Sequence, residues 1–332
     1  MTLPRSQLID LSKTSYYHCM TRCVRQSYLC GYDSETNRDY SHRKKWIVSK
    51  IKHIANIFAI HICAYAIMSN HYHLVLFVND AEALAWNDAQ VIERWSALFP
   101  NDAKTLPEYS KEVAELKIKL WRNRLMDISW FMRCLNEPIA RYSNKEDEKK
   151  GRFWEGRFKS QALLDEGAIL TAMVYVDLNP VRAKIASTPE ESDFTSIQER
   201  IHTFMKHSKT KMNRKDLKKI AFKTPQPKDL MPFSNDKTSS LVSIHYNLMD
   251  YLEMVDSTGR ILRDDKKGVI SDKLEPILNR LGLNPKSWFD NVKHLQRRFS
   301  YAIGHSELLV NFTHSQNKSK SMNAAKNMYL NS

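Results

Sequence analysis

Two histidines, a tyrosine and an asparagine are the side chains of this sequence best suited to act together in chemistry. His71 and His73 flank a tyrosine in an apolar run, and Tyr175 and Asn179 follow about a hundred residues later. Residues i and i+2 of a strand point to the same face, roughly 6.5–7 Å apart, so both imidazoles could reach one cation. Residues i and i+4 of a helix also share a face. If that helix covers the histidine-bearing face, a phenol meets two imidazoles and an amide oxygen.

This ligand set suits a hard divalent cation. Nitrogen and oxygen ligands with open positions fit Mg²⁺ or Mn²⁺ when phosphate oxygens complete the shell. We therefore expect His71, His73 and Asn179 to hold one such ion. Zinc is disfavoured because the set has no thiolate or carboxylate.

The same set predicts a tyrosine nucleophile. With a cation neutralising charge on a scissile phosphate, Tyr175 could attack the phosphorus. A covalent phosphotyrosine would conserve the energy of the phosphodiester for resealing by a strand hydroxyl. A hydrolytic nuclease must instead activate water, and the sequence offers no obvious carboxylate cluster for that. The pattern favours strand transfer over hydrolysis.

Each of these residues also has a purely structural interpretation. Tyr175 lies on an apolar helix, where most tyrosines belong to the core. Asn179 precedes Pro180 and is a good N-cap for a short helix. His71 and His73 could be strand histidines with satisfied hydrogen bonds. Only the joint occurrence of the four favours chemistry.

The elements that would position these residues follow from hydrophobic periodicity. Their order is strand, helix, strand, strand, helix, strand, helix. This order predicts an α+β fold with a ferredoxin-like, four-stranded antiparallel sheet and helices segregated onto it. The expected strands are 16–24, 61–68, 71–78 and an extended segment 151–164; the expected helices are 42–58, 120–143 and 165–178.

Composition divides the chain further. We expect a catalytic domain over 1–200 with an insertion at about 80–120, a basic linker at 201–240, a small all-helical domain at 241–312 and a disordered tail at 313–332. The net charge is +14. Because the excess of Lys and Arg lies after residue 200, the charge favours a polyanionic partner such as nucleic acid. A solvated basic surface is an equal alternative, and 205–220 could form a helix with such a face.

Basic and aromatic side chains alternate at 152–159, as they do on surfaces that bind single strands through phosphate contacts and base stacking. The aromatic residues could equally be core. The candidates for contact with DNA are Arg22, Arg25, Arg152, Trp154, Arg157, Lys159 and Arg182.

Other classes of protein are disfavoured. The five cysteines lack zinc-site spacing and predict reduced thiols. The first residues have no signal-peptide pattern, and no stretch reaches the ~18 apolar residues of a membrane span. We expect a cytoplasmic protein without a membrane partner.

Four segments together, residues 16–25, 66–74, 151–160 and 175–182, resemble the REP-associated tyrosine transposases, which are single-tyrosine transposases of the HUH endonuclease superfamily. The C-terminal third resembles the extensions of longer members. The resemblance implies a core that cuts single-stranded DNA beside a hairpin. It implies that His71 and His73 bind Mg²⁺ or Mn²⁺, and that Tyr175 forms a 5′-phosphotyrosine and releases a 3′-hydroxyl. Asn179 stands where a polar ligand completes the metal site, a position at which glutamine is commoner in some branches.

The expected function is therefore that of a metal-dependent single-stranded DNA endonuclease and strand transferase, a transposase acting on hairpin-flanked repeats. Its partner would be single-stranded or hairpin DNA, and a homodimer is one assembly it could form. One alternative is a catalytically inactive DNA-binding regulator on the same fold, against which the intact Tyr175, His71 and His73 argue. Another is an RNA-binding module, which needs exposed aromatics on the central strands.

Overall fold

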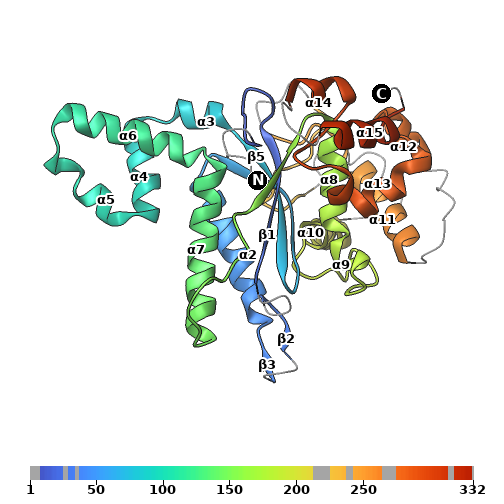
Figure 1. The fold of residues 1–332 in the computed structure, drawn as a ribbon, viewed down its shortest axis with the longest axis horizontal. Helices are drawn as coiled ribbons and strands as arrows, with labels where there is room; N and C mark the ends of the chain where they lie inside the picture. Colours follow the sequence, from blue (N-terminus) through green and yellow to red (C-terminus); the bar gives the residue numbers. More distant parts are fainter. Residues whose placement is uncertain are drawn as a thin grey trace.

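The structure of the chain is a computed structural model that describes residues 8–24, 29–33, 37–211, 225–236, 242–263, 274–312 and 318–330. A sheet with the strand order β4-β5-β1-β6-β7 lies at its centre (Figure 1). The strands are β1 (Tyr16–Arg22), β4 (Ile60–Ile67), β5 (His71–Val78), β6 (Lys159–Leu163) and β7 (Ala302–Ile303), beside a separate hairpin of β2 (Tyr32–Asp33) and β3 (Arg38–Asp39). The expected α+β class is confirmed.

The sheet is mixed. The pairs β4–β5, β5–β1 and β1–β6 are antiparallel, whereas β7 runs parallel to β6. The prediction of four antiparallel strands misses β7, which comes from the segment 241–312 predicted to be all helical. A strand of two residues is too short to show a period in the sequence, and its pairing with β6 depends on the tertiary structure.

Two helices cover one face of the sheet: α2 (His42–Ala55) and α7 (Ile128–Glu146). Ile47, Ile51 and Ile54 form the buried stripe of α2. The single helix predicted over 120–143 is two helices, because α6 (Lys111–Leu125) ends before α7 begins. The break occurs at Asp127, whose carboxylate accepts a hydrogen bond from the Trp130 backbone N–H at 2.9 Å and caps α7.

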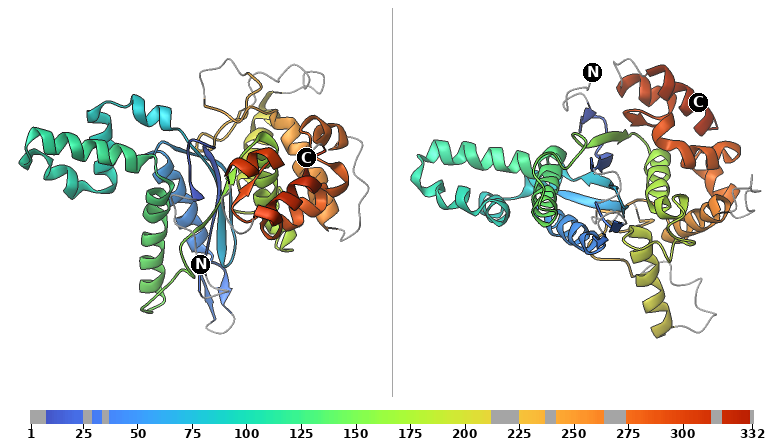
Figure 2. Two further views of the ribbon diagram at one scale, coloured as in Figure 1. Left: turned by 45° about the horizontal axis from the view of Figure 1, so that its top comes forward. Right: turned by 60° about the horizontal axis from the view of Figure 1, so that its bottom comes forward.

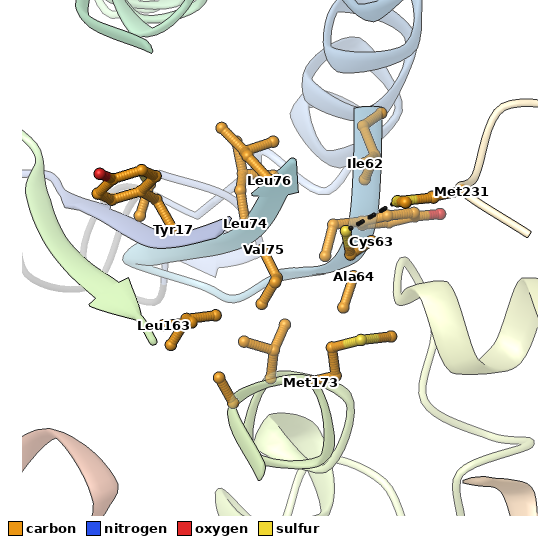
Figure 3. Packing of buried hydrophobic residues seen from close by; sticks show 14 of the residues in the cluster. Tyr17, Ile62, Cys63, Ala64, Leu74, Val75, Leu76, Leu163, Met173 and Met231 are labelled. Atoms are coloured by element: carbon orange, nitrogen blue, oxygen red, sulfur yellow. Dashed lines mark hydrogen bonds between the residues drawn. The ribbon is translucent and has the colours of Figure 1, made fainter. Parts of the chain in front are cut away.

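The opposite face of the sheet is covered by α8 (Glu166–Asp177), which the short helix α9 (Asn179–Arg182) follows. Asp165 is the N-cap of α8, as predicted, and accepts from the Ala168 backbone N–H at 2.8 Å. In Figure 3, Met173 of α8 points toward Val75 and Ala64 of the sheet. All residues of α8 except Glu166 and Ile169 are buried, because further helices cover its outer side.

Those outer helices come from the C-terminal part of the chain: α11 (Leu248–Arg263), α12 (Leu274–Arg280), α13 (Pro285–Arg298), α14 (Ser306–Phe312) and α15 (Lys318–Met328). Both α11 and α13 pack on α8 (Figure 1). The tail predicted to be disordered at 313–332 contains α15. Small and apolar residues of this mostly polar helix, such as Ala325 and Met328, are buried against neighbouring helices, so packing stabilises it where its composition alone would not.

The segment 201–240, predicted to be a basic linker, begins as helix. Residues 201–211 continue α10 (Ser196–Lys211), and 212–224 lie outside the described residues. Met231 is buried in the core, where its backbone N–H donates to the Ile62 carbonyl at 2.8 Å. The Cys63 thiol donates to the sulfur of Met231 (Figure 3).

The insertion predicted at about 80–120 is a helical arm formed by residues 80–125, which projects away from the sheet (Figures 1 and 2). Its elements are α3 (Asp80–Ala85), α4 (Asp88–Leu98), α5 (Pro100–Lys104), the short helix η1 (Leu106–Glu108) and α6. The arm has a small aromatic core in which Trp95 stacks on Trp121 with ring centroids 5.6 Å apart. Among the described residues, no helix combines the length and apolar character needed to cross a membrane.

Candidate active site

Strand register brings polar side chains from three strands onto the face that α8 covers. His73 of β5 lies opposite Met20 of β1, and Met20 lies opposite Lys159 of β6. One rung away, β1 presents His18 opposite Gln161 of β6. Residues two apart on a strand share a face, so both rungs point the same way. The histidine face is therefore wider than the His-x-His motif alone indicates.

The next rung carries His71 of β5 opposite Arg22 of β1. The ring centroids of His71 and His73 are 4.9 Å apart, with their planes nearly perpendicular. His71 is partly exposed, and its Nδ1 lies 2.5 Å from Oδ1 of Asn70 in the preceding turn. An amide oxygen can only accept, so Nδ1 of His71 carries the proton and Nε2 keeps its lone pair.

His18, which is not among the predicted site residues, contacts His73 directly. Its Nε2 lies 3.0 Å from Nδ1 of His73, and its Nδ1 lies 2.8 Å from Oε1 of Gln161. The amide of Gln161 in turn donates from Nε2 to the backbone carbonyl of Phe299 at 2.8 Å. The only signal for His18 in the sequence is its place in a strand, and the facing residues cannot be known before the register is.

The three histidines of this face are held in their neutral form. Burial lowers the pKa of His18 to about 4, while its hydrogen bond to Gln161 acts in the opposite direction and the charge of Arg182 lowers it further. Burial, together with the charges of Arg22 and Arg182, lowers the pKa of His71 to about 4. The pKa of His73 is well below its ordinary value, mainly because the ring is buried. Neutral imidazole is the form that binds metal ions.

Tyr175 of α8 lies against these rings. Its ring centroid is 5.6 Å from that of His73 and 5.8 Å from that of His18, each in an edge-on arrangement. The predicted juxtaposition of Tyr175 with the histidine face is thus present. The residue is only 4 % exposed, so little of it is in contact with solvent.

Arg182 covers the other side of this tyrosine. Its guanidinium carbon is 4.2 Å from the ring centroid of Tyr175, and Nη2 is 3.3 Å from both the Tyr175 hydroxyl and Oδ1 of Asn179. Nη1 donates to the backbone carbonyl of Lys293 in α13 at 3.1 Å. One guanidinium therefore links the tyrosine, the asparagine and the C-terminal helices.

The histidine pair fits a divalent cation. His73 Nε2 is buried and has no hydrogen-bond partner in the described part of the chain, and a buried lone pair without a partner is costly unless something binds it. Asn179 fits less well, since its oxygen accepts from Arg182 and its buried Nδ2 has no partner among the described residues. For Asn179 to be a ligand, its amide oxygen must leave Arg182. The described residues contain no group of three or more His, Cys, Asp or Glu side chains placed to hold a metal.

The residues predicted to contact DNA divide into two groups. Arg22, Lys159 and Arg182 belong to the histidine face or its rim, and Arg22 and Lys159 are exposed there. Arg152 and Arg157 are exposed on the segment that follows α7. Arg25 lies outside the described residues. The basic rim around two neutral imidazoles suits a phosphate group.

The side chain of Trp154 packs against α7 and β5. Its indole N–H donates to the Asn136 carbonyl of α7 at 3.0 Å, and its ring packs edge-on against Tyr72 at 5.9 Å. Tyr72 points away from the histidine face, so Trp154 lies on the α7 side of the sheet. Its predicted role in stacking on a base has no support from this geometry.

No protein-family model matches the sequence, and no curated protein matches it at a significant level. Among solved structures, a REP-associated tyrosine transposase bound to a REP hairpin is similar at 12% sequence identity, with 61% of this chain and 86% of that chain covered and a TM-score of 0.38. A similarity at this level assigns no function to this chain.

Proposed function

We propose that the chain is a metal-dependent single-stranded DNA endonuclease and strand transferase, a transposase that uses Tyr175 as its nucleophile. The observation that carries the proposal is the convergence of Tyr175, from α8, with the neutral histidine pair of β5 and the guanidinium of Arg182, from α9. Three separate elements bring a nucleophile, metal-binding nitrogens and a phosphate-binding cation to one place. Such a combination matches the requirements of phosphoryl transfer to a side chain.

The proposed reaction is a transesterification. The Tyr175 oxygen forms a bond to phosphorus as the bond from phosphorus to the 3′ oxygen breaks. The phenol loses its proton, and the released 3′ oxygen gains one to become a hydroxyl. The product is a 5′-phosphotyrosine, which a strand hydroxyl can attack in the reverse sense to join DNA ends. No high-energy cofactor is consumed because one phosphodiester replaces another.

Around this reaction the side chains have distinct roles. His71 and His73 would hold Mg²⁺ or Mn²⁺, with Asn179 as a third ligand once its amide turns from Arg182. A divalent cation bound there would supply charge neutralisation at the scissile phosphate. Arg182 binds a phosphate oxygen and holds the phenol ring in place through its stacking contact.

The fold is consistent with the same proposal. The antiparallel order β4-β5-β1-β6, with α2 packed on β4 and α7 packed on α2, supports a ferredoxin-like core. We propose that this part of the chain is such a core, with α8 carrying the nucleophile on its other face. Both faces of the sheet are covered, which argues against an RNA-binding module that displays aromatics on an open sheet.

Access to the nucleophile requires movement. Tyr175 is 4 % exposed and its hydroxyl accepts from Nη2 of Arg182, so a DNA phosphate must take over that hydrogen bond, and the adjoining end of α13 must shift, before the phosphate reaches the hydroxyl. The same burial is the observation that favours the second candidate, a catalytically inactive DNA-binding regulator. In that protein the basic rim binds DNA and the tyrosine stays covered.

A trapping assay separates the two. Purified protein is incubated with Mn²⁺ and labelled single-stranded DNA that carries a hairpin and its flanking bases, and the products are resolved under denaturing conditions. We expect a protein–DNA adduct and a new 3′-hydroxyl end for the natural chain, and neither for Tyr175→Phe. Tyr142→Phe, a change at an exposed tyrosine of α7, is the matched control. DNA binding without an adduct under all conditions would favour the regulator, and an adduct that survives Tyr175→Phe would refute this nucleophile.

A further inference from the structure

His18 and Gln161 form a hydrogen-bond chain behind the metal-binding candidate His73. The chain runs from the Phe299 carbonyl to Gln161, from Gln161 to His18, and from His18 to His73, with donor–acceptor distances of 2.8, 2.8 and 3.0 Å. All three side chains are buried, with exposed fractions of 6 % or less. Of the three, only His73 belongs to the His-x-His motif.

The donor and the acceptor of each of these hydrogen bonds follow from the Phe299 carbonyl. A backbone carbonyl can only accept, so Gln161 presents Nε2 to Phe299 and its oxygen to His18. That oxygen can only accept, so Nδ1 of His18 carries the proton. In a neutral ring Nε2 of His18 is then an acceptor, and Nδ1 of His73 must be the donor. His73 is left with a bare Nε2.

We infer that His18 and Gln161 are positioning residues that fix the tautomer and the ring orientation of His73, with the C-terminal segment anchoring them through the Phe299 carbonyl. The free end of the chain is Nε2 of His73, the atom that has no partner among the described residues. Residues that orient a metal-binding histidine commonly accept from its second ring nitrogen. Here the acceptor is the neutral ring of His18, so these hydrogen bonds place no additional charge beside the cation.

The C-terminal segment also contacts the other half of the site. Lys293 of α13 accepts from Arg182 through its carbonyl, and α13 is kinked at the next residue, His294, whose backbone is non-helical (φ −119°, ψ 21°). A kink releases carbonyl groups from the helical ladder. Gln296 donates to the sulfur of Met20 at 3.1 Å. Residues 293 and 296 of α13 and residue 299 directly after it thus contact Arg182, Met20 and Gln161, respectively.

The test compares two substitutions of Gln161. Gln161→Met removes both hydrogen bonds at nearly unchanged volume, whereas Gln161→Glu keeps an acceptor for His18. Ring nitrogens with and without a proton have well-separated ¹⁵N shifts, so NMR of the metal-free protein labelled at histidine reports the tautomer of His73 directly. We expect a bare Nε2 in the natural chain and in Gln161→Glu, and a mixture of tautomers in Gln161→Met.

Metal binding gives the second readout. We expect Mn²⁺ to bind Gln161→Met about 10- to 100-fold more weakly than the natural chain, measured by calorimetry, which is the usual size of such effects. Thr258→Val is the control, because it removes the buried hydrogen-bond partner of the Trp288 indole in the C-terminal helices. It leaves the hydrogen bonds between Gln161, His18 and His73 unchanged. It should lower the melting temperature and leave the tautomer and Mn²⁺ affinity unchanged.

The inference rests on the proposed function only for the identity of the metal site, and the two fail separately. If no Tyr175 adduct forms but the His73 tautomer responds to Gln161→Met, the proposed strand-transferase activity is refuted and the positioning role of His18 and Gln161 is supported. An adduct in the natural chain, together with an unchanged tautomer and Mn²⁺ affinity in Gln161→Met, would refute the positioning role alone. A tautomer shift in Thr258→Val equal to that in Gln161→Met would also refute it.

Discussion

Arg182 has more specific contacts with the candidate nucleophile than any other cation in the described structure. It stacks on the Tyr175 ring and donates hydrogen bonds to the Tyr175 hydroxyl, to Asn179 and to the Lys293 carbonyl. A planar guanidinium can make these contacts at once, because its donors form a rigid fork. Lysine offers a single point of charge on a flexible chain and cannot stack in the same way.

We therefore expect Arg182→Lys to slow adduct formation by about 10- to 100-fold, which corresponds to about 1.4–2.7 kcal/mol of activation free energy. The charge is kept, so affinity for single-stranded DNA should fall much less. Single-turnover kinetics of adduct formation at saturating DNA measure the first effect, and a binding isotherm measures the second. If DNA binding and the adduct rate fall together, Arg182 acts only as a general phosphate contact.

At the residue scale, the sequence predicts that Tyr175 and the histidine pair lie together, but it does not predict their neighbours. His71, His73 and Tyr175 are detectable because their spacing is local to one strand or one helix. His18 and Gln161 join them through the register of β1 with β5 and β6. Register depends on long-range pairing, which no local pattern encodes.

At the scale of elements, Asp177 joins three helices. The carboxylate at the end of α8 accepts hydrogen bonds from Ser196 of α10 and Tyr251 of α11, both at 2.5 Å. It also accepts from the Ile197 backbone N–H at 3.1 Å. Burial raises the pKa of Asp177 to about 6, and these hydrogen bonds act in the opposite direction.

This raised pKa has a defined effect on stability. The folded state binds the Asp177 proton more tightly than the unfolded chain does, so this group destabilises the fold as pH rises from about 4 to about 6. Asparagine cannot ionise. We expect the free energy of unfolding of the natural chain, relative to Asp177→Asn, to fall by about 3 kcal/mol across that range. Urea melts of both proteins at intervals from pH 4 to 7 check this. A relative stability that is constant or rises with pH contradicts the assigned pKa.

The elements themselves were predictable where a local signal exists. The strand predicted at 71–78 is confirmed as β5, and the N-cap Asp165 begins α8 as expected. The predictions fail where packing overrides composition. The C-terminal stretch is polar on average, yet Tyr329 there is 2 % exposed and its hydroxyl donates to Asp165 at 2.7 Å. This buried tyrosine attaches the C-terminal stretch to the start of α8, which averages of charge and hydropathy do not reveal.

At the scale of the whole molecule, the arm of residues 80–125 has its own core and projects from the sheet (Figure 2). Trp121→Ala should remove about 3–5 kcal/mol of packing there, because Trp121 is buried and stacks on Trp95. We expect hydrogen exchange to accelerate across α4 and α6, while the strands β1 and β5 keep their protection. Loss of protection in the strands as well would mean that arm and sheet unfold as one unit.

Gly304 tests how the C-terminal segment is attached to the sheet. It follows β7, and a Cβ atom added there would lie 2.8 Å from Cβ of Leu164 and 3.0 Å from Oδ2 of Asp165. Neither neighbour can move without shifting the start of α8. We expect Gly304→Ala to lower the free energy of unfolding by about 1–3 kcal/mol and to weaken Mn²⁺ binding, measured by urea melts and calorimetry. Unchanged metal affinity in a destabilised variant would show that the attachment of β7 and the histidine site are independent.

The anchoring of α8 by Tyr329 has a consequence for the order of events during synthesis. Asp165, which begins the helix that carries Tyr175, has as partners the backbone of His305 and the hydroxyl of Tyr329. A growing polypeptide emerges from its N-terminus onward at about 5–20 residues per second. The histidines are thus made more than two hundred residues before Tyr329, the last group that braces α8. A nascent chain on the ribosome should therefore not complete the bracing of α8 until translation has passed Tyr329.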